Sequence, residues 1–289
     1  MEGQAKHLRE LLSAHRSAEG RRARSFTITS GKGGVGKSNL ALNLSLAFAE
    51  LGHKVFLVDA DVHLANLDML LGVKPEGTLG DVVLRGCPLE EIVLDGPMGI
   101  KLVPASSGVR ELLTAEEWAW VKLREALDVI EGEADIVVVD TAAGLSKGVL
   151  DMALSTDEVV LVTTPEPTAV VDAYAMVKVI SPQREGGSMH LVINRVSSQS
   201  EAEEVFGKLN QVISHFLGLK VRFSGFILED ACVPKAVARQ SPFLLMYPNS
   251  KASSCLRRIA RGLLGIPEER RGLWVRGLSR LRDKGGVEI

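Results

Sequence analysis

The feature that most constrains this chain is a glycine-rich stretch between a β-rich run and a helical pattern. Residues 31–38 read Gly-Lys-Gly-Gly-Val-Gly-Lys-Ser, which fits the spacing G-x-x-x-x-G-K-[ST] of a phosphate-binding loop. A β-rich run, 25–29, precedes the loop, and residues 39–51 follow with apolar side chains at helical spacing. Strand, glycine loop and helix in this order form an anion site, because the loop N–H groups and the positive end of the helix face one centre.

Individual loop residues have separate expected roles. Lys37 is expected to reach the β- and γ-phosphates of a nucleotide, and Ser38 offers a hydroxyl to Mg²⁺. The remaining nucleotide contacts are expected along the same stretch, from Gly31, Lys32, Gly33, Gly34, Val35, Gly36 and Asn39. A purely structural glycine turn is the alternative, and the flanking strand and helix patterns disfavour it.

The order of apolar runs predicts one large α/β domain. Several runs are continuously apolar, which is typical of parallel strands covered on both faces. Their alternation with helical patterns predicts a doubly wound, mostly parallel sheet. The expected strands are 54–58, 100–103, 135–139, 158–163, 189–193 and 221–226, and the expected helices are 116–130, 147–154, 169–180 and 201–217. We place the domain at residues 25–265, between an N-terminal segment, 1–24, and a C-terminal segment, 266–289.

Charge and cysteine content limit which binding partners and which cellular compartment we expect for this chain. The net charge is −2, but residues 1–24 and 256–289 together carry +8, which leaves −10 on the middle of the chain. An acidic body disfavours non-specific binding to nucleic acid, whereas the basic ends are candidates for contact with an anionic partner. The three cysteines are scattered and no apolar run reaches 18 residues. We therefore expect a cytoplasmic protein without disulfides or a membrane-spanning helix.

Aspartates directly follow two of the predicted strands. Asp59 and Asp61 end one strand, and Asp140 ends another. A carboxylate beside a buried strand is costly unless its charge is used, and a Mg²⁺–phosphate centre uses it. Asp140 is therefore predicted to hold Mg²⁺ through water, with a helix N-cap as the alternative.

Three motifs together resemble the deviant Walker A ATPases of the MinD/ParA family. They are K-G-G-V-G-K-S at 32–38, V-D-A-D-x-x-x-x-N-L-D at 58–68 and D-T-x-A-G at 140–144. The resemblance implies a P-loop NTPase of the MinD/ParA (SIMIBI) type, a slow ATPase that forms a homodimer with ATP and Mg²⁺. It further implies that Lys32 reaches the partner subunit's nucleotide, that Asp61 positions the attacking water and that Asp59 lies near Mg²⁺. Catalysis would then rest on Lys32, Lys37 and Asp61.

The same resemblance suggests where the base binds. Asn194 and Arg195 lie where this family reads the purine edge with an asparagine, and an amide offers both a donor and an acceptor to adenine. An asparagine that only starts a turn is the alternative.

Two segments resemble one branch of the family, the flagellar-number regulators of the FlhG/FleN type. They are residues 164–175 and the N-terminal residues 4–9. The resemblance implies control of the number and placement of flagella, with the signal-recognition-type GTPase FlhF as a partner. Flagellar C-ring proteins and a flagellar transcription regulator are further candidate partners. The expected contacts with FlhF come from Gln4, Ala5, Leu8 and Arg9, although Gly3 replaces an aspartate of that element. A helix packed on its own domain is the alternative for 3–16.

The C-terminal segment carries an amphipathic pattern. Leu273, Trp274, Leu278 and Leu281 fall within an arc of about 140° on a helix, and arginines flank them. Such a helix suits an anionic bilayer surface, so we expect peripheral association with the cytoplasmic face of the cell membrane when ATP is bound. A helix packed back onto the protein is the alternative.

Other readings remain open within and outside the family. The nearest are a MinD-like regulator of the division site and a ParA-like ATPase that partitions DNA or cargo. The ParA-like reading would use Arg257, Arg258 and Arg261 as a basic surface. A phosphoryl-transfer enzyme would leave Lys32 without a role, and an iron–sulfur carrier would need paired cysteines.

Overall fold

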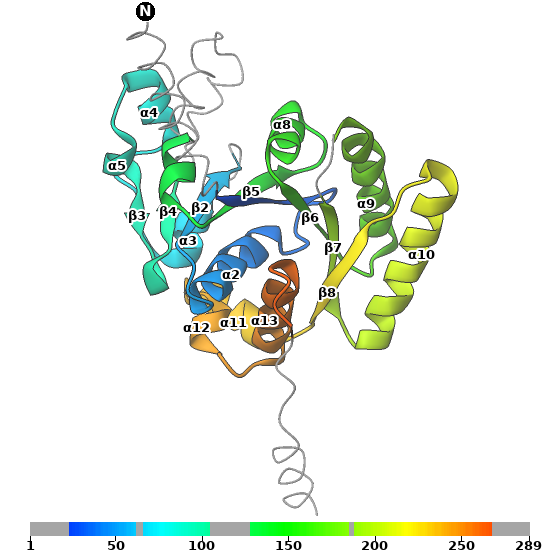
Figure 1. The fold of residues 1–289 in the computed structure, drawn as a ribbon. Coiled ribbons are helices and arrows are strands. Elements are labelled where there is room, and N and C mark those ends of the chain that lie inside the picture. The colour runs from blue at the N-terminus through cyan, green and yellow to red at the C-terminus, as the bar shows by residue number, and fades with distance from the viewer. Residues whose placement is uncertain (1–22, 62–65, 105–127, 185–187, 268–289) are drawn as a thin grey trace, which may run out of the picture.

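A computed structural model describes residues 23–61, 66–104, 128–184 and 188–267. These residues form an eight-stranded sheet with the order β3-β4-β2-β5-β1-β6-β7-β8 and helices on both faces (Figure 1). The strands are β1 (Arg24–Ser30), β2 (Val55–Ala60), β3 (Leu94–Asp95), β4 (Lys101–Val103), β5 (Ile136–Ala143), β6 (Glu158–Thr163), β7 (Ser188–Val196) and β8 (Arg222–Leu228). The longer helices are α2 (Lys37–Glu50), α8 (Lys147–Ser155), α9 (Pro167–Ile180), α10 (Gln199–Leu217) and α13 (Lys251–Leu263). The shorter ones are α3 (Leu67–Leu71), α4 (Leu79–Arg85), α5 (Leu89–Ile92), α11 (Cys232–Ala238) and α12 (Phe243–Met246).

The observed sheet confirms the predicted doubly wound architecture. Every strand pair is parallel except the antiparallel pair of β3 and β4 at one edge. The central strands are buried almost throughout, as their continuous apolar runs predicted. Every strand predicted from the sequence is present, and β3 is an addition.

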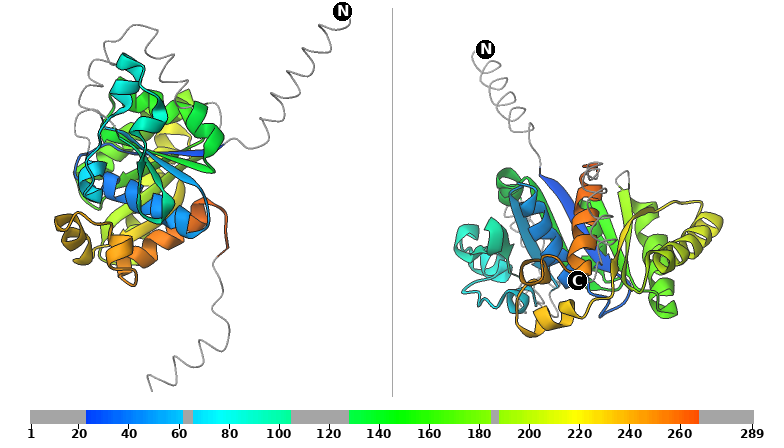
Figure 2. Two further views of the ribbon diagram at one scale, coloured as in Figure 1. Left: turned by 90° about the vertical axis from the view of Figure 1, so that its left-hand side faces the viewer. Right: turned by 90° about the horizontal axis from the view of Figure 1, so that it is seen from below.

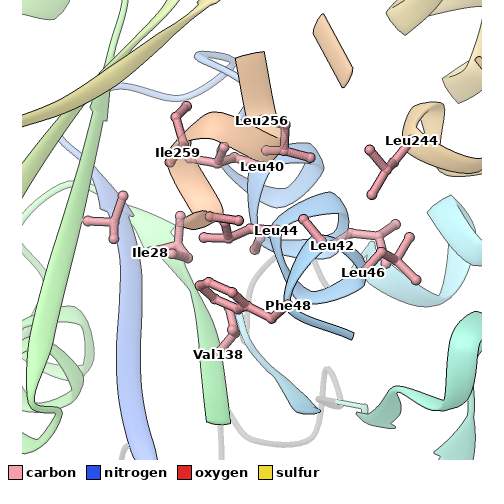
Figure 3. Packing of buried hydrophobic residues seen from close by; sticks show 14 of the residues in the cluster. Ile28, Leu40, Leu42, Leu44, Leu46, Phe48, Val138, Leu244, Leu256 and Ile259 are labelled. Atoms are coloured by element: carbon pink, nitrogen blue, oxygen red, sulfur yellow. The ribbon is translucent and has the colours of Figure 1, made fainter. Parts of the chain in front are cut away.

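Alternate residues of the central strands supply two cores. On one face Ile28 and Val138 pack with Leu40, Leu44 and Phe48 of α2, the helix that follows the glycine loop (Figure 3). On the other face the neighbouring residues of the same strands pack against α4 and α5 at one end and against α8, α9 and α10 at the other. Because both faces are covered, only the strand ends remain available for chemistry.

Helices α11, α12 and α13 were not predicted from the sequence. Leu256 and Ile259 of α13 are buried against α2 and β8, and Figures 2 and 3 show this helix beside α2. Arg257 of α13 binds both carboxylate oxygens of Glu50 at the end of α2, at 2.7 and 2.8 Å. Helix α13 therefore holds α2, the helix that follows the glycine loop, in place on the sheet.

Several predictions concern residues that the structure does not describe. The expected partner contacts Gln4, Ala5, Leu8 and Arg9 and the expected membrane contacts at 273–281 lie outside the described ranges, as does most of the helix expected at 116–130. Among the helices within those ranges, none is long and apolar enough to cross a membrane.

A partly buried polar cluster joins the amino ends of four strands. The carboxylate of Glu158 accepts a hydrogen bond from Arg24 at 2.5 Å and lies 2.6 Å from Nε2 of His190. Nδ1 of His190 lies 2.6 Å from the hydroxyl of Ser224 in β8, and Arg24 also donates to the carbonyl of Leu263 at the end of α13. Burial raises the pKa of Glu158, but the hydrogen bonds from His190 and Arg24 outweigh burial and leave this pKa below its ordinary value.

Glu158→Gln keeps the shape of the side chain and removes the charge that Arg24 and His190 face. We expect the free energy of unfolding, measured by urea denaturation at neutral pH, to fall by about 2 kcal/mol, because Arg24 and the buried His190 lose the carboxylate to which they are bonded. The matched control is Glu204→Gln, which breaks an exposed ion pair with Lys208 and should cost less than about 0.5 kcal/mol.

The same cluster predicts a pH dependence. The pKa of Glu158 is lower in the folded chain than its ordinary value of 4.5, so the ionised carboxylate stabilises the fold above that pH. This stabilisation is lost as the pH falls below 4.5 and through the pKa of the folded chain. The stability difference between the native chain and Glu158→Gln should therefore shrink below that pH. A difference that stays constant into acid would contradict the assignment.

Candidate functional site

The glycine loop joins β1 to α2 at the carboxyl edge of the sheet. Gly34 and Gly36 have φ values of 78° and 93°, a left-handed conformation that glycine adopts without a steric cost. Gly36 is the N-cap of α2, and no side chain of the described residues caps it. The first N–H groups of α2 are thus available to an anion, as a phosphate-binding loop requires. Gly31 lets the loop approach α9, since a Cβ there would lie 2.5 Å from the carbonyl oxygen of Asp172.

Lys37 and Asp140 form a buried ion pair directly beneath this loop. Nζ of Lys37 lies 3.1 Å from Oδ1 of Asp140, and the two side chains are 9% and 1% exposed. Asp140 lies within β5, whereas Ser146 is the N-cap of the helix that follows. The alternative of Asp140 as a helix N-cap is therefore wrong, and its carboxylate is directed to the loop lysine instead.

Two carboxylates sit side by side at this edge. Asp59 and Asp140 are direct partners in the register of β2 and β5. Burial, together with the charge of Asp140, raises the pKa of Asp59 to about 7. Burial also raises the pKa of Asp140, and the ammonium group of Lys37 opposes this rise. Two desolvated, mutually repelling carboxylates beside a phosphate loop are arranged for a cation.

The residues present fit Mg²⁺. Oδ2 of Asp140 is buried without a hydrogen-bond partner among the described residues, and the nearby side chain of Ser38 opposes the rise that burial causes in the pKa of this carboxyl. Within the described ranges no cluster of three or more His, Cys, Asp and Glu side chains could hold a metal alone. Ser38, Asp59 and Asp140 would therefore hold the ion together with phosphate oxygens and water, the ligands that Mg²⁺ prefers.

Asp61 lies close to this group. It is buried at the end of the described part of its segment, and its backbone N–H donates to Oδ1 of Asp59 at 3.0 Å. The N–H of Leu67 points to the other oxygen of Asp59, at 3.4 Å. The carboxylate of Asp59 therefore bonds to the backbone on both sides of residues 62–65, which lie outside the described ranges. Lys37, Ser38, Asp59, Asp61 and Asp140 are thus brought together as predicted, from three sequence segments.

Lys32 is placed differently from Lys37. Its Nζ lies 2.7 Å from Oε2 of Glu166, in the connection between β6 and α9, and 2.8 Å from Oγ1 of Thr168, in the first turn of α9. The ammonium group lowers the pKa of Glu166 through this hydrogen bond and its charge. The residues 164–168 stood out in the sequence only through their resemblance to one branch of the family, and their contact with Lys32 was not predicted. A clue lay in Glu166, a carboxylate at the carboxyl end of a predicted strand, as Asp59 and Asp140 are.

Asn194 lies against the loop. Its Nδ2 donates to the carbonyl of Val35 at 2.7 Å, and its Oδ1 accepts from the N–H of Arg195 at 2.9 Å. Arg195 itself is exposed. The contact of Asn194 with Val35 was not predicted from the sequence, and the adenine contact of Asn194 and Arg195 stays a prediction.

Known proteins similar to this chain include nucleotide-binding proteins, as the geometry of the site suggests. Residues 26–243 match the model of the CobQ/CobB/MinD/ParA nucleotide binding domain. The chain is 39% identical to the antiactivator FleN of Pseudomonas aeruginosa, over 82% of this chain and 84% of that protein. It is 33% identical to the flagellum site-determining protein YlxH of Helicobacter pylori, over 84% and 85% of the two chains. Among solved structures, the septum site-determining protein MinD of Pyrococcus horikoshii, complexed with Mg-ADP, has a TM-score of 0.67 and 25% identity, over 87% of this chain and 98% of that one.

Asp140→Asn tests the metal role of the buried pair. It keeps the shape of the side chain and removes the charge that would hold a water on Mg²⁺. ATP affinity is measured by calorimetric titration with Mg²⁺ and again with EDTA. We expect the ratio of the two affinities to be about 10- to 100-fold smaller in Asp140→Asn than in the native chain. Asp95→Asn is the control, since the carboxylate of Asp95 pairs with Lys101 at the exposed edge of the sheet. An unchanged Mg²⁺ dependence in Asp140→Asn would argue against the site.

Proposed function

Because this chain belongs to the CobQ/CobB/MinD/ParA nucleotide-binding family, we propose that it is an ATPase switch that controls the number and placement of flagella. The observation that carries the proposal is the similarity, over more than four fifths of the chain, to an antiactivator FleN and a flagellum site-determining YlxH. The geometry supports the ATPase part through Lys37, Asp140 and Ser38 beneath the glycine loop. ATP or ADP with Mg²⁺ is the proposed ligand.

The proposed switch is a homodimer that forms with ATP. Lys37 is engaged with Asp140 inside its own subunit, whereas Lys32 is 37% exposed and bonded to Glu166 and Thr168 at the start of α9. An exposed loop lysine beside the phosphate site can enter the site of a second copy. There it stabilises the charge of phosphoryl transfer as an arginine finger does, so hydrolysis is slow until two subunits meet.

Asp61 is the proposed water-positioning residue. It is buried beside Asp59, directly after β2. In a loose transition state the orientation of the attacking water matters more than early removal of its proton. A carboxylate with its backbone fixed on Asp59 suits that role, and hydrolysis then resets the dimer.

The two basic ends are the proposed partner surfaces. The N-terminal residues Gln4, Ala5, Leu8 and Arg9 engage the GTPase FlhF, and flagellar C-ring proteins or a transcription regulator are further partners. The C-terminal residues 273–281 bind the anionic cytoplasmic face of the membrane. One short helix binds weakly and two in a dimer bind together, so attachment follows ATP. The protein is thus cytoplasmic and peripheral to the membrane when ATP is bound.

A DNA-partitioning role has less support from the structure. The three arginines of α13 that such a role would use all have contacts within the chain. Arg257 binds Glu50, the guanidinium of Arg258 lies 5.5 Å from the ring centre of Phe226, and Arg261 is directed to the carbonyl of Pro267. A role at the division site, as in the MinD proteins, is the remaining alternative.

Lys32→Ala tests the proposed dimer mechanism. We expect ATP affinity within about threefold of the native chain and turnover at least about 100-fold lower, because the variant lacks the charge supplied to the partner's phosphates. Lys37→Ala, the same change five residues along the loop, should instead lose ATP binding. Turnover is measured by phosphate release across a range of protein concentrations. A Lys32→Ala variant with native turnover would refute the trans role.

Stimulation of the GTPase tests the flagellar assignment. The full chain with ATP should raise the GTP hydrolysis rate of purified FlhF from the same cell at least several-fold. Deletion of residues 1–22 should abolish this effect and leave the ATP affinity of the domain unchanged, because the glycine loop lies outside the deletion. Absence of stimulation by the intact chain would favour the division-site alternative.

A further inference from the structure

The side chain of Asn194 connects the end of β7 to the phosphate loop. Its Nδ2 donates to the carbonyl of Val35, which is itself buried. We propose that Asn194 is a positioning residue that holds the loop in its anion-binding conformation, independently of any contact with a base. The inference rests on the proposed nucleotide site, and it adds a second role for a residue expected only to read adenine.

The bond acts on the peptide unit that most needs a fixed orientation. Val35 lies between Gly34 and Gly36, both with positive φ, so the surrounding backbone can rotate easily. In a trans peptide the C=O and the next N–H point in opposite directions. A Val35 carbonyl held on Asn194 therefore directs the N–H of Gly36 to the other side, where the phosphate would bind. A rotated peptide would present a carbonyl oxygen to the phosphate and repel it.

Asn194 is held in place on its own side. Its Oδ1 accepts from the N–H of Arg195, a residue with a φ of 58°. The left-handed conformation is uncommon for a residue with a side chain, and the register between β7 and β8 shifts between Ile193 and Val196. The backbone thus leaves the regular strand at the point where its N–H can fix the amide of Asn194.

The loop is shaped to receive this side chain. A Cβ at Gly36 would overlap Nδ2 of Asn194, so glycine is needed there for contact as well as for its φ. An amide has two donor hydrogens and two acceptor lone pairs. The bonds to Val35 and Arg195 use one of each, so the clamp is compatible with a simultaneous contact to a base.

A ligand without a base separates the two roles. Inorganic tripolyphosphate with Mg²⁺ offers the loop a phosphate chain and nothing for a base reader to recognise. Asn194→Asp keeps the shape of the side chain and replaces the donor with an oxygen that repels the Val35 carbonyl. We expect the affinity of the full chain for Mg-tripolyphosphate to fall about tenfold or more, with at least as large a loss for Mg-ATP.

A ligand-free measurement gives an independent readout. Hydrogen–deuterium exchange in peptides that cover 31–38 should be faster in Asn194→Asp than in the native chain, because the loop is no longer clamped. Asn249→Asp, a change of the same kind at an exposed position, is the control and should alter neither readout. Asn194→Ala repeats the test without a new charge, and unfolding midpoints show that the variants are folded.

The outcomes distinguish this inference from the proposed function. The Asn194 variants could bind tripolyphosphate as the native chain does and lose affinity for ATP alone, or change their preference between ATP and GTP. Either result would overturn the positioning role and show that Asn194 only recognises the base. Unchanged loop exchange would also overturn it. A native chain that binds neither ATP nor tripolyphosphate would instead refute the nucleotide site itself.

Discussion

The buried pair of Lys37 and Asp140 is the interaction around which the rest of this structure is arranged. Lys37 begins α2 and Asp140 lies in β5, so their contact fixes the helix after the glycine loop against the centre of the sheet. An unpaired charge in so dry a place would be strongly unfavourable. Asp59 adds a second carboxylate with a raised pKa, and the site therefore favours the addition of a cation and a phosphate chain.

The two edges of the sheet have different tasks. The carboxyl edge holds residues that repel one another and have unmet bonding capacity, such as Oδ2 of Asp140. The amino edge holds a cluster in which Glu158 satisfies both Arg24 and His190. The unpaired oxygen of Asp140 thus lies where a ligand can use it, whereas the carboxylate of Glu158 at the opposite edge is bonded to its neighbours. The hydrogen bond from Arg24 to the carbonyl of Leu263 joins the first strand of the sheet to the end of α13.

Patterns that are local in the sequence were predicted well. The strands were found because a strand buried on both faces must be continuously apolar, as in β5 and β6. The glycine loop was recognised because its motif combines glycines, a lysine and a hydroxyl at one spacing, and the binding of phosphate and metal by these residues stays a prediction. Helix α13 was missed although its buried and exposed residues alternate at helical spacing, because its arginines suggested a charged surface. Their actual partners, Glu50 and the ring of Phe226, are distant in the sequence.

The amino-acid sequence by itself determined the fold class, the phosphate loop and the aspartates at the strand ends, because each follows from neighbouring residues along the chain. Only the tertiary structure decided which group each of these residues faces. Lys32 meets Glu166 and Thr168, and Asn194 meets Val35, across more than 130 residues of sequence. The physical reason is that parallel strands bring their carboxyl ends to one edge whatever their order along the chain. Spacing can name the residues at that edge, but the packing of loops and helices on it sets their partners.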